Sequence, residues 1–225
     1  MTRPLVIIRP EPGSSQTAAL AAAKGLTAHR FPLFNAFALP WDAPESARYT
    51  GVIMTSASAA RFAGPKLADY LHLPLYAVGD VTAVAARDAG FGSVVSGDGD
   101  VNRLLGKVAT LGHHRMLHIA GVDFHPFEPH GLEIDRVAVY KAEVLAPPAA
   151  LDDMLRDHAV VLLHSPRAAA QFAKHVDERA IDRSTIAIVA ISANAAAAAG
   201  QGWQKIVVSV YPRDDALVQA ATTLY

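Results

Sequence analysis

Small hydroxyl residues and a glycine stand where apolar runs of the sequence give way to helical patterns. These residues are Thr55, Ser56, Ser58, Gly79, Thr82 and Ser165. Hydroxyl groups and the free backbone N–H groups at a helix start both donate hydrogen bonds, and the partial positive charge of a helix N-terminus favours anions. In an open α/β sheet such turns border the crevice where ligands bind. The sequence therefore predicts binding of an anionic ligand.

The same residues also have a purely structural interpretation. Serine is a favoured N-cap, so Ser56 could cap a helix and do nothing more. Ser165 followed by Pro166 is typical of a helix start, because proline is favoured at the first helical position. Asp80 is expected to cap the helix after Gly79, since a carboxylate suits an N-cap but would repel an anion. Both interpretations stay open from these residues alone.

The elements that must position these residues alternate between strand and helix. Apolar runs ended by glycine, as in Leu75–Gly79, predict short strands, and the apolar spacing between them predicts helices. Pro32 marks residues 27–39 as an edge strand or crossing segment. The element order of residues 51–111 returns at 160–224 with nearly constant spacing, which indicates duplication of one α/β unit. We therefore expect an α/β fold of two similar parallel-sheet domains.

The composition narrows the possible classes of protein. The chain has 225 residues, no cysteine, and 20 Lys plus Arg against 21 Asp plus Glu, a formal net charge of −1. This near-neutral charge, without a basic run, argues against a nucleic-acid partner. No apolar run is long enough for a membrane helix, and the N-terminal run does not fit a signal peptide. Without cysteine no disulfide can form, so a cytoplasmic location is expected.

The sequence predicts neither a metal site nor a cofactor. Among the ten histidines, His113, His114 and His118 lie close in sequence, but no pair is spaced on a helix for a shared metal. Gly97 and Gly99 are not followed by the Lys-Ser/Thr or GxGxxG pattern of a phosphate-binding loop.

Four runs of the sequence together resemble one known family. They are TSASAARF at 55–62, YAVGDVTAVAARDAGF at 76–91, RVAVYKAEV at 136–144 and HSPRAAAQF at 164–172. In this order they resemble uroporphyrinogen-III synthase, which closes the linear tetrapyrrole hydroxymethylbilane into uroporphyrinogen III in haem biosynthesis. The resemblance implies a cofactor-free lyase that loses water from its substrate and inverts ring D through a spiro intermediate.

The resemblance also implies roles for individual residues. Tyr140, in the family's Val-Tyr motif, would donate a proton to the departing hydroxyl, which suits a phenol with a pKa of about 10; a half-buried strand aromatic is the alternative. Arg9 would pair with a substrate carboxylate, and Thr82 matches the threonine of a family turn. Ser192 and Asn194 are further candidate contacts, although the family's Gly-Pro-Thr-Thr turn is missing there.

The domain organisation follows from the resemblance as well. It implies two flavodoxin-like domains. The first would be discontinuous, residues 1–36 plus 146–225, and the second would be inserted, residues 39–140. Extended linkers would lie near 36–40 and 140–146, and the substrate cleft would lie between the domains. The chain is expected to act as a monomer.

Two other classes of protein remain open. A tandem α/β binding or sensory protein for a small acidic ligand would have much the same sequence, because the duplication and the anion-suited turns serve binding as well as catalysis. A two-domain glycosyltransferase would need a longer chain and a nucleotide-diphosphate site. Turnover of the linear tetrapyrrole separates the enzyme from the binding protein.

Overall fold

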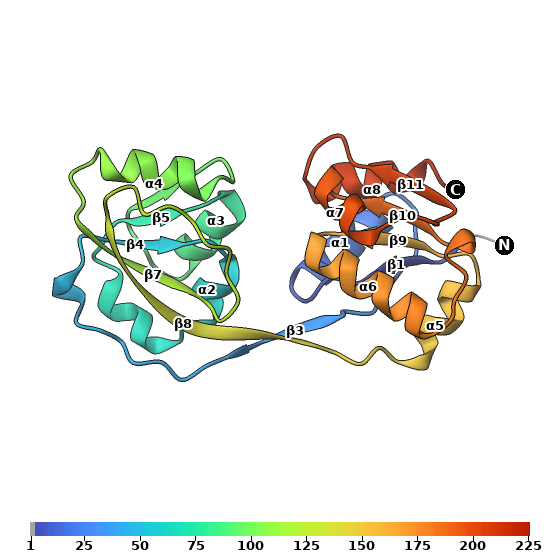
Figure 1. Ribbon diagram of the computed structural model, residues 1–225, viewed down its shortest axis with the longest axis horizontal. Helices are drawn as coiled ribbons and strands as arrows, with labels where there is room; N and C mark the ends of the chain where they lie inside the picture. The colour runs from blue at the N-terminus through green and yellow to red at the C-terminus, as the bar shows by residue number, and fades with distance from the viewer. Residues whose placement is uncertain (1–2) are drawn as a thin grey trace. The chain divides into compact units, whose positions relative to one another are not determined.

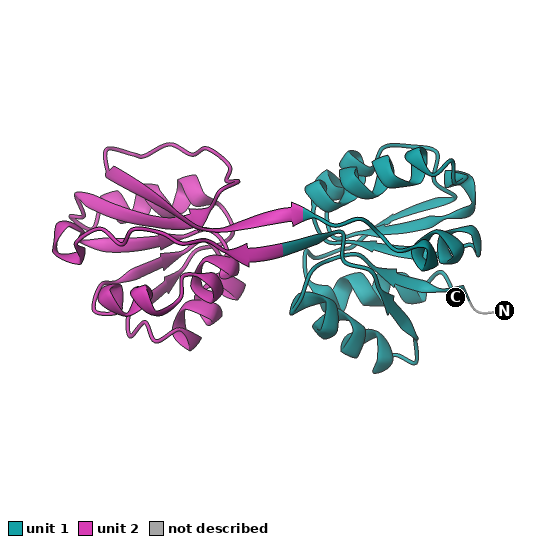
Figure 2. Cartoon of the chain, turned by 90° about the horizontal axis from the view of Figure 1, so that it is seen from below, with its two compact units in different colours: residues 1–35, 144–225 teal, residues 36–143 magenta. Residues whose placement is uncertain are grey.

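The protein contains two β-sheets built from parallel strands, each covered by helices on both faces (Figure 1). This is seen in a computed structural model that describes residues 3–225. The chain divides into two compact units, coloured separately in Figure 2. Unit 1 comprises residues 1–35 and 144–225, and unit 2 comprises residues 36–143. The predicted α/β class with parallel sheets is confirmed, whereas the predicted linkers stay a prediction.

Unit 1 is built from both ends of the chain. Its strands are β1 (Leu5–Ile7), β2 (Ala28–Arg30), β9 (Val160–Leu163), β10 (Ala187–Ala190) and β11 (Lys205–Val208). Its helices are α1 (Gly13–Ala22), α5 (Ala149–Arg156), α6 (Pro166–Glu178), α7 (Ala193–Ala199) and α8 (Asp214–Thr222). The sheet order is β11-β10-β9-β1-β2, so β1 from the N-terminal part pairs with β9 from the C-terminal part. The segment with Pro32 follows β2, which is an edge strand as expected.

Unit 2 is formed by one continuous stretch of chain. Its strands are β3 (Phe34–Ala38), which begins at the end of unit 1, β4 (Gly51–Met54), β5 (Leu75–Ala77), β6 (Val94–Ser96), β7 (Arg115–Gly121) and β8 (Glu133–Val144). Its α-helices are α2 (Ala57–Phe62), α3 (Asp80–Asp88) and α4 (Val101–Ala109). The sheet order is β3-β8-β7-β4-β5-β6. The central strands β4, β5 and β7 are apolar because both faces of the sheet are covered.

Side chains that alternate along each strand supply a separate core on either face of each sheet. In unit 1, Val6 packs in the cluster under α5, α6 and α7, and Leu5 packs in the cluster under α1 and α8. In unit 2, Val52 faces α2 and α3, whereas Ile53 faces α4. None of these buried clusters of described residues contains residues of both units.

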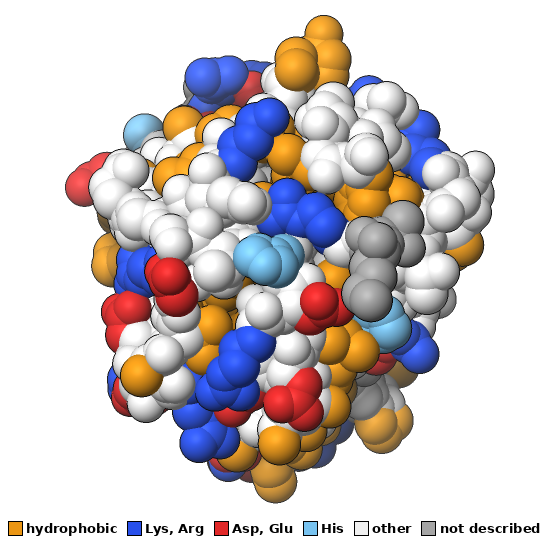
Figure 3. Space-filling view, turned by 90° about the vertical axis from the view of Figure 1, so that its right-hand side faces the viewer, with side chains coloured by type: hydrophobic (Ala, Val, Ile, Leu, Met, Phe, Trp, Pro, Cys, Tyr) orange, Lys and Arg blue, Asp and Glu red, His pale blue; other side chains and the backbone are white. Residues whose placement is uncertain are grey.

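The surface carries charges of both signs. The face in Figure 3 shows Lys and Arg side chains interspersed with Asp and Glu rather than a patch of one sign, in keeping with the net charge of −1. Within residues 3–225, no helix has the length and apolar character needed to cross a membrane.

Candidate functional site

A pocket of about 350 Å³ lies where the strands of the unit 2 sheet end. Thr55 and Ser56 follow β4, Val78 follows β5, and Gly121 ends β7. We call it the Tyr140 pocket, and its lining residues are Thr55, Ser56, Val78, Gly99, Val101, Gly121, Asp123, Phe124, His125 and Tyr140. The carboxyl ends of parallel strands are the usual position of a ligand in an open α/β sheet. The pocket brings together three predicted site residues: Thr55, Ser56 and Tyr140.

Tyr140 is positioned by an irregularity between β7 and β8. The two strands pair in regular register up to Ala120 and Ala138, and then Gly121 pairs with Tyr140, so that Val139 is an extra residue. Such a bulge redirects the side chains beside it. A Cβ at Gly121 would lie 2.7 Å from Cζ of Tyr140, so the phenol ring lies directly against the glycine backbone. Only glycine allows this close approach.

Thr55 has a buried polar neighbour in the middle of β7. Its Oγ1 lies 3.3 Å from Nε2 of His118, a residue with no exposed surface. The imidazole packs against the rings of Phe127 and Phe124, with centroid distances of 5.2 and 6.2 Å. Burial, and secondarily the charge of Arg136, lowers the pKa of His118 to about 4. His118 is therefore neutral at pH 7.

Arg136 brings a positive charge to the loop that follows β7. Its Nη1 donates to the carbonyl oxygen of Gly121 at 2.8 Å, and its guanidinium carbon lies 4.0 Å from the centre of the Phe124 ring. Both contacts fix residues that line the Tyr140 pocket. The charge beside the pocket suits an anionic ligand.

Ser56 takes the capping role that its sequence position allowed. Its Oγ accepts a hydrogen bond from the N–H of Ser58 at 3.2 Å at the start of α2. The capping interpretation of Ser56 is therefore confirmed. Ser56 also lines the Tyr140 pocket, and Ser58 lies in the first turn of the same helix.

The start of α3 differs from the prediction. The N-cap is Gly79 and not Asp80, which is the first helical residue and makes no capping bond. The carboxylate of Asp80 instead accepts a hydrogen bond from Ser96 Oγ at 2.7 Å, at the end of β6. Thr82 is buried, with 7% of its surface exposed, and its N–H donates to the Gly79 carbonyl at 3.0 Å. Gly79 directly follows the pocket residue Val78, and Thr82 lies in the first turn of the helix that begins there.

The predicted residues of unit 1 follow the carboxyl ends of its strands. Ser165 caps α6 by accepting from the N–H of Ala168 at 3.2 Å, and Ser192 caps α7 by accepting from Ala195 at 3.3 Å. Asn194 is exposed in the first turn of α7. The capping interpretation of Ser165 is therefore confirmed, whereas the cap formed by Ser192 was not predicted.

Arg9 belongs to a polar cluster that the sequence analysis missed. Its Nη1 lies 2.6 Å from Oδ2 of Asp214, the first residue of α8. Thr17 Oγ1 lies 3.0 Å from the same carboxylate oxygen and 3.3 Å from Nε2 of His164. Burial, followed by the charge of Arg9, lowers the pKa of His164 to about 4. The charge of Arg9 is therefore balanced within unit 1.

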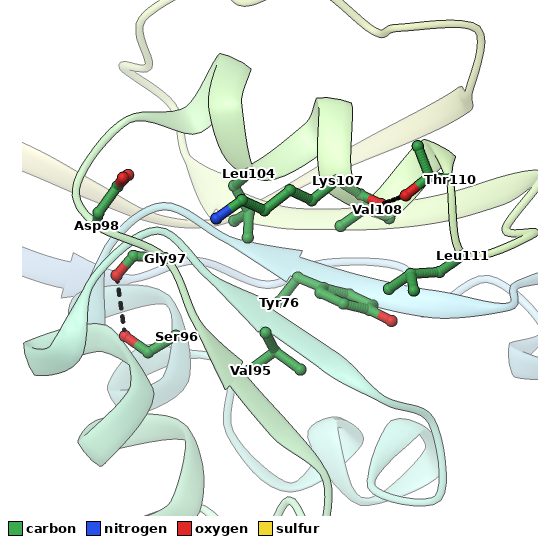
Figure 4. A pocket seen from close by; sticks show the side chains of 10 residues that line it. All are labelled: Tyr76, Val95, Ser96, Gly97, Asp98, Leu104, Lys107, Val108, Thr110 and Leu111. Carbon is green, nitrogen blue, oxygen red and sulfur yellow. Dashed lines mark hydrogen bonds between the residues drawn. The ribbon is translucent and has the colours of Figure 1, made fainter.

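A second pocket of unit 2, of about 270 Å³, contains none of the predicted site residues. Figure 4 shows the apolar side chains of Tyr76, Val95 and Leu104 in it, with the long side chain of Lys107 beside them. The Tyr76 hydroxyl lies 2.6 Å from Nε2 of His113 and is therefore already partnered. The lining carries one cation, Lys107, and one carboxylate, Asp98, so its charges do not favour an acidic ligand.

Several residues that shape the site were not singled out as site residues from the sequence. His118 carries a weak signal, because a histidine inside the apolar strand RMLHIAG needs a polar partner. Gly121 ends that strand, but its contact with Tyr140 depends on strand pairing. Arg136 shows no sequence signal. Within residues 3–225 no three His, Asp or Glu side chains form a group suited to a metal ion.

Comparison with known proteins agrees with this architecture. The family model described as Uroporphyrinogen-III synthase HemD matches residues 15–219. Among solved structures, uroporphyrinogen-III synthetase from Helicobacter pylori is 16% identical, with a TM-score of 0.69 and 100% of both chains covered. A mutant uroporphyrinogen III synthase from Thermus thermophilus is 16% identical, with a TM-score of 0.55, 99% of this chain and 98% of that chain covered. At such identity these structures show the shared fold alone. The search of curated proteins gave no significant match.

Proposed function

The chain belongs to the uroporphyrinogen-III synthase family, and we propose that the Tyr140 pocket is where it binds and activates hydroxymethylbilane. The enzyme is a cyclising lyase that converts this linear tetrapyrrole into uroporphyrinogen III with loss of water and inversion of ring D. The family match over residues 15–219 supports this enzyme over a binding or sensory protein and over a glycosyltransferase.

The reaction needs a proton for the departing hydroxyl, and it needs the substrate to be held in one conformation. The terminal hydroxyl leaves with a proton as water and gives an electrophilic azafulvene. The substituted carbon of ring D attacks it to form the spiro intermediate, and reopening and reclosure leave that ring inverted. The substrate supplies most of the reactivity, so the protein acts mainly by holding the folded chain and preventing direct closure to the symmetric isomer.

Tyr140 delivers the proton in this proposal. Its phenol lines the pocket and its ring rests on Gly121, which leaves the side chain little freedom to move. A positioned phenol donates to a leaving hydroxyl and takes the proton back after ring closure. This placement of Tyr140 beside Thr55 and Ser56 is the observation that carries the proposal.

Hydrogen-bond donors around the pocket hold the carboxylates nearest to ring D. We assign this role to the Thr55 hydroxyl, to the N–H of Ser56 and the hydroxyl of Ser58, and to the turn from Gly79 to Thr82 at the start of α3. Asp80 keeps its negative charge, but its carboxylate accepts a hydrogen bond from Ser96 at the end of β6, so we assign it no contact with the substrate. A pocket of about 350 Å³ lies near the lower end of ligand pockets, so it takes one end of the tetrapyrrole.

Residues of unit 1 bind further carboxylates in the same proposal. Arg9 does so by exchanging Asp214 for a substrate carboxylate, which preserves its charge balance. The hydroxyl oxygens of Ser165 and Ser192 accept capping hydrogen bonds, which leaves their protons free to be donated. Contacts from these turns therefore come from the two hydroxyls, from backbone N–H groups and from the amide of Asn194.

We further propose that the chain works as a monomer in the cytoplasm. Each buried cluster of the described residues is formed within one unit of a single chain, which supports the monomer. The biosynthetic role of the family and the absence of cysteine support the location. Light scattering of the purified protein tests the oligomeric state.

Product analysis tests the proposed function. Hydroxymethylbilane is supplied to the purified protein without metal or cofactor, the products are oxidised, and the porphyrin isomers are separated by chromatography. We expect type III to dominate, because the protein must prevent the uncatalysed closure that gives type I. A product that contains only type I, as in the protein-free control, contradicts the proposal.

A further inference from the structure

We propose that His118 is a positioning residue that fixes which way the Thr55 hydroxyl points. It is held as the Nε2–H tautomer, donates to Thr55 Oγ1, and so leaves the Thr55 proton free to be donated into the Tyr140 pocket. The identity of the acceptor, a substrate carboxylate, rests on the proposed function.

The backbone brings the two residues together on one face of the sheet. His118 pairs with Ile53 in the parallel register of β7 and β4, and Thr55 lies two residues further along from Ile53. Side chains two residues apart share a face of a strand. Nε2 of His118 accordingly lies 3.3 Å from Oγ1 of Thr55, and Thr55 lines the pocket.

The surroundings of the ring decide its tautomer. Neutral histidine carries its single proton on one nitrogen and leaves the other as an acceptor. Nδ1 is buried and has no hydrogen-bond partner among residues 3–225. The ring lies against Phe124 and Phe127. A buried N–H without an acceptor is rarer in proteins than an unused lone pair, so Nδ1 remains bare and the proton lies on Nε2.

The tautomer determines what Thr55 offers to a ligand. A hydroxyl has one proton and two lone pairs. When Nε2–H donates to Oγ1, the hydroxyl proton is free for a carboxylate in the pocket. With the opposite tautomer, the Thr55 hydroxyl would donate its proton to Nε2 and present only lone pairs to the pocket, which repel a carboxylate. His118 thus determines whether Thr55 attracts or repels an anionic substrate group.

Nuclear magnetic resonance tests the tautomer without any substrate. The protein is labelled with ¹⁵N-histidine, and a long-range ¹H–¹⁵N spectrum is recorded at neutral pH. Comparison with the spectrum of His118→Gln assigns the His118 signals. We expect the Nε2–H pattern, whereas an Nδ1–H pattern or a charged ring overturns the proposal.

Kinetics with hydroxymethylbilane test the consequence for binding. We expect His118→Leu to raise KM about tenfold with little change in kcat, because a hydrogen bond to a charged group is weakened. Thr55→Val should have a similar effect, and the double variant should be no worse than either. His118→Gln, whose amide reaches the position of Nε2, should restore KM in large part.

Two outcomes of the kinetics contradict the proposal. They are an unchanged KM in a folded His118→Leu protein and fully additive effects in the double variant. His118→Leu places an apolar side chain among aromatic rings, so the protein should fold, and circular dichroism checks that it does. If the wild-type protein gives no type III product, the proposed function fails, while the resonance experiment still decides the tautomer.

Discussion

Tyr140 is held by a neighbour that contributes no side chain. Because a Cβ at position 121 would lie 2.7 Å from the phenol ring, Gly121→Ala must displace the ring from the pocket. We expect kcat to fall roughly as far as in Tyr140→Phe. The effect on the free energy of unfolding should be smaller than the effect on kcat. Gly92→Ala is the matched control, since a Cβ there meets no atom within 4 Å. Equal activity of both alanine variants would show that the position of the ring is unimportant.

Removal of the Tyr140 hydroxyl separates proton donation from substrate positioning. We expect Tyr140→Phe to lower kcat about tenfold and to keep type III as the main product, because positioning of the chain carries most of the rate. Tyr211→Phe, at a site 59% exposed in unit 1, should leave the rate unchanged. Complete loss of activity in folded Tyr140→Phe would contradict this ranking.

Two buried neutral histidines make the protein sensitive to acid. The pKa values of His118 and His164 are lowered from 6.5 to about 4 by burial. Below about pH 6.5 the unfolded chain binds protons that the folded chain does not. The full free energy of unfolding is therefore present above this pH, and it falls as the pH drops toward 4. When the pH is lowered from about 7.5 to about 5, we expect the free energy of unfolding to fall by roughly 2 kcal/mol for each of the two histidines.

Urea denaturation at the two pH values measures this loss. In His118→Leu the dependence on pH should be weaker, because one of the two groups no longer titrates. An unchanged dependence would mean that His118 is already charged in the folded protein.

At the scale of elements, a buried carboxylate joins α5 to α6. Asp152 Oδ1 lies 2.7 Å from Nε2 of His175, and its Oδ2 lies 3.1 Å from Nε of Arg179. Asp152→Ala leaves the buried imidazole without its partner, so we expect a loss of roughly 2 kcal/mol in unfolding free energy. The neighbouring Asp153→Ala should cost little, because that side chain is 81% exposed. Denaturation midpoints of the two variants compare them, and equal losses would contradict the structural role of Asp152.

Local signals in the sequence predict the elements better than they predict the contacts between them. Ser165 followed by Pro166 identified the start of α6, because capping needs only neighbours in the chain. The sequence alone does not distinguish Asp80 from Gly79 as the N-cap of α3, because both residue types occur there; the hydrogen bond that Asp80 accepts from Ser96 comes from another strand and has no local signal. The pairing of Thr55 with His118 and the contact of Gly121 with Tyr140 depend on strand register, which no local pattern contains.

At the scale of the whole molecule, each unit contains one of the two tryptophans. Trp41 stacks on Tyr70 in unit 2, and Trp203 stacks on Phe172 in unit 1, with centroid distances of 6.0 and 5.4 Å. Trp41→Phe and Trp203→Phe variants therefore report on one unit each. Because the buried cores of the described residues are separate, we expect Asp152→Ala to shift the fluorescence transition of Trp203 and not that of Trp41. Equal shifts of both transitions would show a single cooperative unit.

The two-fold organisation of the chain could be recognised from the sequence because both copies keep the same order of strand, turn and helix. Matching blocks around Ser56 and Ser165 correspond to β4 with α2 and to β9 with α6. The pairing of β1 with β9 could not be recognised from the sequence, because parallel pairing between distant segments produces no periodic pattern in either of them. The likeness to a known family, rather than any pattern, led to the expectation of a discontinuous first domain.

The interleaved course of the chain sets an order of events during protein synthesis. β1 is translated early, but its partner β9 begins only at Val160, after all of unit 2. At about 5–20 residues per second the ribosome needs roughly 8–30 seconds to reach β9. Unit 2 can complete its sheet in that interval, whereas the apolar strand Leu5–Ile7 can pair with β2 but must wait for β9 on its other side. One edge of the apolar strand β1 therefore stays unpaired throughout that interval, and an unpaired strand edge is a site where a nascent chain can aggregate.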